Sequence, residues 1–249
     1  MKISEVKKHT STPLTSPANP PCTHRFLKRE HLFIVYKTDK SALEKVVPEP
    51  LELLDEPLVR FEVMKMPDST GFGDYTECGQ AIPVKYKGEE GDYLHMMYLD
   101  NIEATIMGRE VGYPKKIGYP KLFVDEDTLI GKLDYGSSRF RVANATMTYK
   151  FYPMSKEDAL KKISSTNFML NFHPNYDGTP RIQELVKNHA VDVDILEAWT
   201  GPARLELFQH VNCPLADLPV REIVGAYYII TNLTLGKCEV VYDYLKDGK

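Results

Sequence analysis

The sequence has few features that would assign it to a nucleic-acid, membrane or metal-binding class. Its 249 residues include four scattered cysteines with no C-x-x-C pair, so neither a zinc site nor a disulfide framework is indicated. The formal net charge of -4 argues against a nucleic-acid partner. No apolar run reaches the ~18 residues that span a bilayer, and the N-terminus lacks a secretory signal. We therefore expect a cytoplasmic protein that binds neither nucleic acid nor membrane.

The motifs of several common chemistries are also missing. There is no H-E-x-x-H, no G-x-S-x-G and no G-x-x-x-x-G-K-[ST], and Gly71 and Gly73 lack the third glycine of a dinucleotide fingerprint. The seven histidines are dispersed along the chain. We expect no metal site and no nucleotide cofactor.

The overall composition is that of an ordinary folded protein, with 43% hydrophobic and 27% charged residues. The length suits one large domain, predicted to span residues 1–249. Residues 1–25 contain Pro13, Pro17, Pro20 and Pro21 among serines and threonines, which predicts an extended arm rather than a helix.

Apolar and polar residues alternate along several segments, which is the period of a half-buried strand. Val59, Phe61 and Val63 alternate with polar residues, and a second alternation runs over residues 143–151. Further strands are predicted at residues 32–38, 80–86, 93–99, 129–135, 190–196, 205–208 and 237–244. Helices are predicted at 101–111 and 156–163. The capping-box spacing of Ser41 and Glu44 predicts a further short helix that opens at Ser41. This pattern indicates a mainly β (α+β) fold, a barrel or sandwich with antiparallel pairing.

A pair of lysines stands in the sequence Y-P-K-K at residues 113–116. Paired lysines in a Pro/Gly turn usually lie in solvent. Alternatively, Pro114 and Gly118 could fix the turn while Tyr113 helps to exclude water from one amine, which would favour its neutral, nucleophilic form.

Three charged residues, Arg29, Glu62 and Glu77, interrupt apolar or strand-like segments. Strand alternation places Glu62 on the face opposite Phe61 and Val63. Taken alone, each of the three is best interpreted as a charge on a solvated strand face.

Eight stretches of the chain carry a family resemblance: STPLTSPA (11–18), VVPEPLE (46–52), EPLVRFE (56–62), YTECGQAIPV (75–84), GDYLHMMYLDN (91–101), YPKKIGYPKLFVD (113–125), PNYDG (174–178) and EAWTGPARL (197–205). Together they closely resemble the acetoacetate decarboxylase family along almost the whole length. The resemblance implies decarboxylation of acetoacetate through a lysine Schiff base. It also implies an antiparallel cone-shaped β-barrel with a flanking sheet and a few short helices, and assembly into large homo-oligomers, dodecamers among them.

By this resemblance the Schiff-base lysine is Lys115, and the following lysine of the motif is Lys116, which is expected to modulate the pKa of the nucleophile. A reactive, unusually acidic lysine is already a known property of the family, so only its cause is open to argument. Adjacent residues of an extended segment point to opposite sides, so Lys116 is predicted to point away from Lys115. We therefore expect burial to matter more than repulsion between the two lysines.

The resemblance places the other functional residues at Arg29, Glu62 and Glu77. We assign Arg29 to holding the substrate carboxylate or orienting a glutamate, Glu77 to proton handling and Glu62 to a supporting role. Tyr113 and Met97 are expected to contact the substrate, a small 3-oxo acid.

A protonated imine accepts the electrons released with carbon dioxide, so the resemblance implies no metal or organic cofactor. Two alternatives stay open. The same lysine could serve aldol condensation or dehydration of another oxo acid, or the chain could be a non-catalytic barrel that binds a small ligand with Lys115 as counter-charge. The presence of Arg29 and both glutamates favours the decarboxylase.

Overall fold

Two β-sheets form most of the molecule in the computed structural model, which describes residues 1–18 and 22–247. The larger sheet has the order β10 (Tyr152–Pro153), β13 (Ala190–Thr200), β15 (Glu222–Leu235), β1 (Arg25–Lys37), β3 (Leu58–Ser69), β4 (Gly73–Tyr86), β5 (Glu89–Leu99), β11 (Thr166–Pro174), β12 (Pro180–Asn188) and β16 (Glu239–Asp243). Two short strands extend it, β2 (Glu52–Leu53) beside β4 and β6 (Lys115–Ile117) beside β5. The smaller sheet has the order β14 (Ala203–Leu207), β9 (Phe140–Thr148), β8 (Thr128–Tyr135) and β7 (Tyr119–Asp125).

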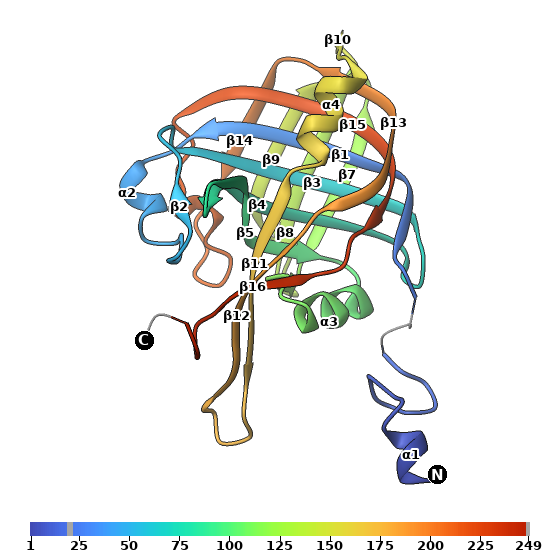
Figure 1. The fold of residues 1–249 in the computed structure, drawn as a ribbon. Helices are drawn as coiled ribbons and strands as arrows, with labels where there is room; N and C mark the ends of the chain where they lie inside the picture. Colours follow the sequence, from blue (N-terminus) through green and yellow to red (C-terminus); the bar gives the residue numbers. More distant parts are fainter. Residues whose placement is uncertain (19–21, 248–249) are drawn as a thin grey trace.

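Strand pairing is antiparallel except where β5 meets β6 and β11. The mainly β class is therefore confirmed. The larger sheet is strongly curved (Figure 1), but within the described residues its hydrogen-bonded order starts at β10 and ends at β16. The expected cone-shaped barrel is thus a curved sheet that does not close.

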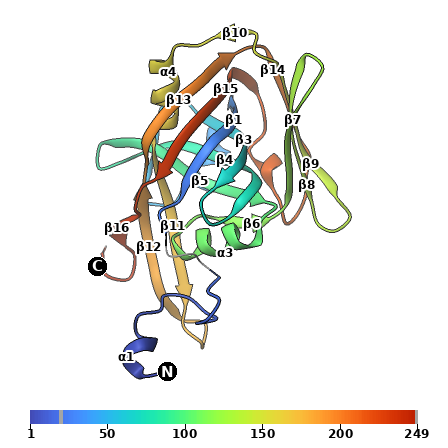
Figure 2. The same cartoon turned by 90° about the vertical axis from the view of Figure 1, so that its right-hand side faces the viewer.

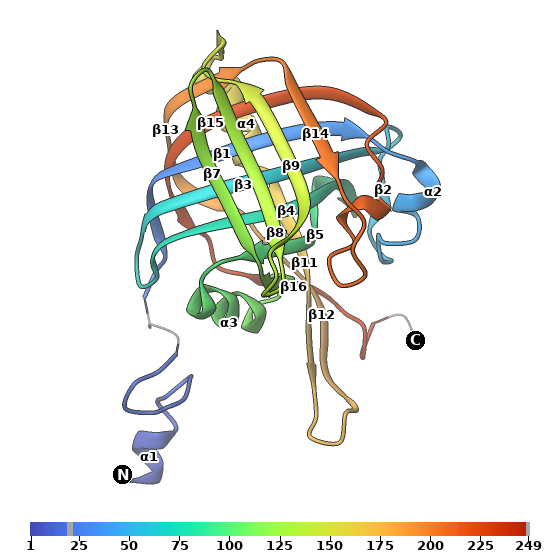
Figure 3. The ribbon, with the colours of Figure 1, turned by 180° about the vertical axis from the view of Figure 1, so that it is seen from behind.

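The smaller sheet crosses the back of the larger one, and a core fills the space between them (Figure 3). The larger sheet contributes Leu32, Ile34 and Val63, and the smaller sheet contributes Leu129 and Leu133, all fully buried. Burying apolar surface between two sheets in this way is the main stabilising contribution of the fold.

A second apolar cluster covers the opposite face of the same central strands. It joins Phe33 of β1 and Met64 of β3 to Ala159 and Ile163 of helix α4 (Lys156–Ile163), which lies on that side of the sheet (Figure 2). Successive residues of β1 and β3 therefore enter two different cores. Neither face of these strands is open to water along this stretch.

The two longer helices lie where the sequence predicts them. In α3 (Ile102–Glu110) the Asn101 side chain accepts a hydrogen bond from the amide of Ala104 at 2.8 Å. In α4 the Ser155 hydroxyl accepts one from the amide of Asp158 at 3.1 Å. Capping of this kind satisfies amides that have no partner inside the helix.

The short helices differ from expectation. Helix α2 (Lys40–Leu43) exists, but its N-cap is Asp39, so the capping role assigned to Ser41 is wrong. A further one-turn element is the 3-10 helix η1 (Leu215–Asp217). Within the described ranges no helix is long and apolar enough to cross a membrane.

The N-terminal arm contains a one-turn helix, α1 (Ile3–Val6), so the prediction of a helix-free arm is wrong there. The Glu5 carboxylate accepts a hydrogen bond from the backbone amide of Lys2 and closes the turn. Pro20 and Pro21 lie outside the described residues.

The strand predicted at residues 143–151 ends earlier, at Thr148. Lys150 has a positive φ of 47° and turns the chain, and Phe151 beyond it is exposed.

Candidate active site

One cavity on the α4 side of the larger sheet brings together almost every residue that the sequence selects. Its volume is about 80 Å³, several times the ~10–15 Å³ that one water molecule needs. The selected residues in its wall are Arg29, Glu62, Glu77, Met97, Tyr113 and Lys115. Lys116 is not among the lining residues.

The register of four neighbouring strands explains this convergence. Glu62 of β3 lies opposite Gly79 of β4, Gly79 opposite Met97 of β5, and Met97 opposite Lys115 of β6. Residues directly opposite one another point to the same face of a sheet. Gly79 lacks a side chain, and a Cβ there would lie 2.5 Å from the backbone oxygen of Met96, so the sheet allows only glycine at this point.

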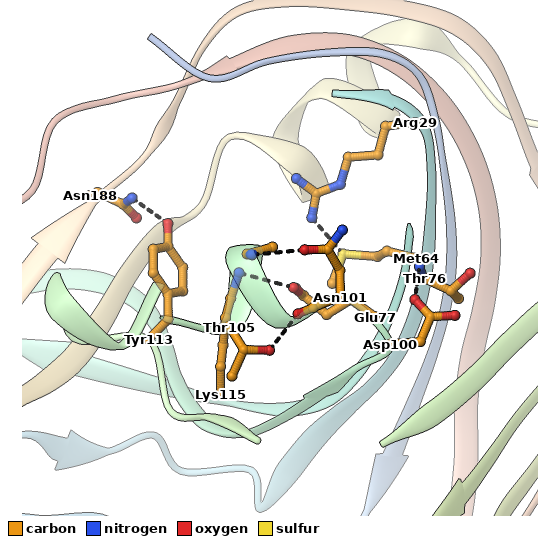
Figure 4. A network of polar contacts seen from close by, with 11 residues as sticks. Arg29, Met64, Thr76, Glu77, Asp100, Asn101, Thr105, Tyr113, Lys115 and Asn188 are labelled. Carbon is orange, nitrogen blue, oxygen red and sulfur yellow. Dashed lines mark hydrogen bonds and ion pairs between the residues drawn. The ribbon is translucent and has the colours of Figure 1, made fainter. Parts of the chain in front are cut away.

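Lys115 is one of the residues that line the cavity, and its amine points toward Glu77 (Figure 4). Its Nζ is 3.2 Å from Oε2 of Glu77 and 5.0 Å from the ring centroid of Tyr113. The two charged side chains are only 9% and 3% exposed. The interpretation of Lys115 and Glu77 as solvated charges is therefore wrong, because buried apolar residues cover this strand face, Met64 and Leu99 beside Glu77 and Met97 and Tyr113 beside Lys115.

Lys116 points to the other side of β6. Its Nζ donates a hydrogen bond to the backbone oxygen of Asn212 at 2.7 Å and lies 5.9 and 5.3 Å from the rings of Tyr98 and Tyr135. The predicted divergence of the two lysines is confirmed. The charged group that contacts the Lys115 amine is instead a carboxylate.

Arg29 lies at an irregularity of β1, where the register with β15 shifts between Phe26 and Arg29. Its Nη2 donates to the sulfur of Met64 at 2.8 Å, and its Nε is buried without a partner. The described residues include no carboxylate in ion-pair contact with this guanidinium. Arg29 thus offers the cavity a half-buried cation that can receive an anionic ligand.

Glu62 belongs to a buried ion network that the sequence did not reveal. The Arg60 guanidinium donates to Glu62 at 3.1 Å through Nε and to Asp92 at 2.8 Å through Nη1. Burial raises the pKa of the Glu62 carboxyl, and the positive charge of Arg60 opposes that rise. Glu62 is 4% exposed, so its interpretation as a solvated charge is also wrong.

His31 is a cavity residue that the sequence analysis missed. Its Nε2 lies 3.0 Å from the hydroxyl of Thr231, and its Nδ1 is buried without a partner. Burial lowers the pKa of His31 well below its usual value, and the nearby Arg29 and Arg60 lower it further. The imidazole is therefore neutral at neutral pH. The available signal was the alternation of β1, which puts His31 on the same face as Arg29 and Phe33.

The two expected substrate contacts are buried side chains. The Tyr113 hydroxyl accepts a hydrogen bond from the Asn188 side chain, and burial raises the pKa of the phenol, which keeps it protonated. Met97 is 4% exposed and forms an apolar part of the wall. Over the described residues, no three His, Cys, Asp or Glu side chains are grouped so that they could hold a metal ion.

Comparisons with known proteins agree with this geometry. The family model described as acetoacetate decarboxylase matches residues 11–245. An acetoacetate decarboxylase of Clostridium botulinum is 60% identical over 247 residues, covering 99% of this chain and 100% of its own length. A solved structure from structural studies of acetoacetate decarboxylase has a TM-score of 0.96 at 58% identity, covering 99% of this chain and 100% of that one. A second solved structure, the enzyme of Legionella pneumophila, has a TM-score of 0.91 at 44% identity and covers 96% of each chain.

Proposed function

This chain belongs to the acetoacetate decarboxylase family, and we propose that Lys115 carries its reaction as an imine-forming nucleophile. The enzyme is a lyase that converts acetoacetate to acetone and carbon dioxide. The observation that supports the role of Lys115 is its placement: a buried amine 3.2 Å from a buried carboxylate in the wall of the cavity.

The reaction needs a site for the electrons that carbon dioxide leaves behind. The neutral amine of Lys115 adds to the C3 carbonyl of acetoacetate, and loss of water gives a protonated imine. The bond to the carboxylate breaks, and its electron pair moves toward the iminium nitrogen to form an enamine. The enamine takes a proton at carbon, and water hydrolyses the resulting imine to acetone and the free amine.

Glu77 is the group best placed to move protons in this sequence. Its Oε2 contacts the amine directly, so it can take the ammonium proton before attack and return a proton during loss of water. Glu62 makes its contact with Arg60 instead. Its supporting role is to neutralise the positive charge of Arg60 in the cavity wall beside Glu77.

Arg29 is assigned to the substrate carboxylate. The cation has no carboxylate partner within the described residues, whereas orienting a glutamate would require such a contact. The carboxylate loses its charge as carbon dioxide forms, so binding to Arg29 stabilises the bound substrate more than the transition state. Tyr113 and Met97 form the adjoining wall.

Assembly and location extend the proposal beyond the single chain. We propose a large homo-oligomer, a dodecamer, as the family resemblance implies. Exposed apolar residues such as Phe172 and Tyr176 support an assembled state.

We place the enzyme in the cytoplasm because its four cysteines are free thiols, two of them exposed, which suits a reducing compartment.

Kinetics of three variants test the assignment. Lys115→Ala should abolish acetone and carbon dioxide release while the protein still folds. Glu77→Gln should lower kcat by a factor on the order of 10²–10⁴, the usual contribution of general acid–base catalysis. Arg29→Gln should act mainly by raising KM. Substantial turnover by Lys115→Ala, or release of an aldol or dehydration product in place of carbon dioxide, would overturn the proposal.

A further inference from the structure

A glycine in helix α3 faces the side chain of the nucleophile. Gly108 is buried in the last turn of α3. A Cβ added to it would lie 2.5 Å from Cδ, 2.8 Å from Cε and 3.1 Å from Nζ of Lys115. We propose that Gly108 is a positioning residue for the reaction: its missing side chain leaves the space in which the Lys115 side chain reaches the cavity.

The same helix turn also holds the backbone around the nucleophile. The backbone oxygen of Gly108 accepts a hydrogen bond from the amide of Tyr113 at 3.0 Å. The Arg109 guanidinium donates one to the backbone oxygen of Lys115 at 3.2 Å. The end of α3 therefore fixes where the main chain of β6 begins, and Gly108 fixes which path the lysine side chain can take from it.

Helix stability does not explain a glycine here. Glycine is a poor helix former, and alanine at an ordinary interior helix position is more favourable. The atoms that a Cβ would meet are the far end of a flexible side chain, not backbone. The helix could therefore accept alanine by displacing Lys115, which makes the space a requirement of the lysine rather than of the fold.

The displacement would occur at the reacting group. Ordinary contact begins at 3.4 Å and the Cβ would lie 2.5 Å from Cδ, so the lysine would shift by about 1 Å. Its Nζ now contacts Glu77 at 3.2 Å. A shift of ~1 Å in a reacting group can lower the rate by a factor on the order of 100.

The test compares Gly108→Ala with Ile106→Ala. Ile106 is on the same helix but is 41% exposed, so its variant introduces the same alanine away from the cavity. We expect Gly108→Ala to lose kcat on the order of 100-fold with KM changed by less than about threefold, because the wall that binds the substrate is untouched. Borohydride inactivation in the presence of acetoacetate should slow in parallel. Ile106→Ala should match the parent enzyme in both measurements.

A double-variant cycle covers the case in which Gly108→Ala lowers stability. If the cost comes from contact with the lysine, Gly108→Ala should shift the unfolding midpoint downward less in a Lys115→Ala background than in the parent. Equal shifts in the two backgrounds, or parent-like kcat in a folded Gly108→Ala enzyme, would overturn the proposal. The inference rests on Lys115 as nucleophile. If that assignment fails, Lys115→Ala stays active, while the stability cycle still reports on the contact.

Discussion

The Lys115 amine contacts a carboxylate, with its Nζ 3.2 Å from Oε2 of Glu77. Only a neutral amine can attack the substrate, so this carboxylate is the nearest acceptor for the proton that the amine must lose. Entry of substrate into the cavity, with its own carboxylate paired to Arg29, is the event that we expect to release the amine from Glu77.

Removal of the second lysine tests how far charge repulsion contributes. Lys116 is held by Asn212 and two tyrosine rings on the other side of β6, where water and salt weaken its field. We predict that Lys116→Met leaves the acidic limb of the pH profile of kcat/KM within about half a unit of the parent. Glu77→Gln is the comparison expected to change the profile. An upward move of two units or more in Lys116→Met would show that repulsion dominates.

A histidine outside the cavity gives stability a pH dependence. Burial lowers the pKa of His95 from 6.5 to about 4, against a smaller opposing effect of Asp217. Between pH 6.5 and about pH 4, His95 binds a proton in the unfolded chain but stays neutral in the folded protein. His95 therefore destabilises the fold as pH falls below 6.5, and its effect levels off below about 4.

We predict that the parent loses about 2 kcal/mol more stability between pH 7 and pH 5 than a His95→Gln variant does. Urea unfolding at the two pH values measures the difference. His9→Gln, in the exposed N-terminal arm, should behave like the parent. An equal loss in the parent and in His95→Gln would contradict the account.

Individual elements show how far the sequence could predict the fold and the site. The helix at residues 156–163 was predicted to the residue because its cap and apolar spacing are local signals. Strand β7 was not predicted, and β11, β12 and β15 carry no clean alternation. Strand β15 pairs with β1, which lies far away in the chain, so a local pattern does not contain that partner. Strands β7 and β11 each pair with the strand that follows them, and they were missed because their own alternation is weak.

The site shows the same division between local and distant information. Alternation correctly put Glu62 opposite Phe61 and Val63, but alternation of one strand cannot tell whether its second face meets water or another layer. Helix α4 and β15 supply that layer, so Glu62 is buried. The family resemblance identified Lys115, Arg29 and the two glutamates because it carries information that the single strand lacks.

Contact between the two sheets depends on a glycine on β8. A Cβ on Gly131 would lie 2.9 Å from side-chain atoms of both Leu32 and Val63. We predict that Gly131→Ala destabilises the protein by about 1–3 kcal/mol, the usual cost of overpacking a core. The folded fraction should keep the parent kcat, because the substitution lies on the face away from the cavity. Chemical unfolding measures the first value and steady-state kinetics the second.

Lys132→Ala, the next residue of β8, is the matched control and should change stability by no more than about 0.5 kcal/mol. If Gly131→Ala unfolds at the same denaturant concentration as this control, the two sheets are packed less tightly than the structure indicates.

The whole molecule carries an unusual projection, the hairpin of β11 and β12, which extends well below the body in Figure 1. Tyr176 at its tip is fully exposed and Phe172 is 49% exposed. We predict that sedimentation gives a mass about twelve times that of the chain and that Phe172→Ser with Tyr176→Ser lowers it. Phe140→Ser, an exposed aromatic on the smaller sheet, is the control. A fully active monomer would contradict the proposed assembly.

Decarboxylation through an imine requires a covalent bond between the substrate and one lysine, and trapping that bond tests this mechanism most directly. Borohydride added together with acetoacetate should inactivate the enzyme irreversibly, and peptide mass mapping should place one reduced adduct on Lys115. Borohydride alone should leave the enzyme active. An adduct on Lys116 or Lys121, or complete turnover with no adduct on any lysine, would contradict the central claim.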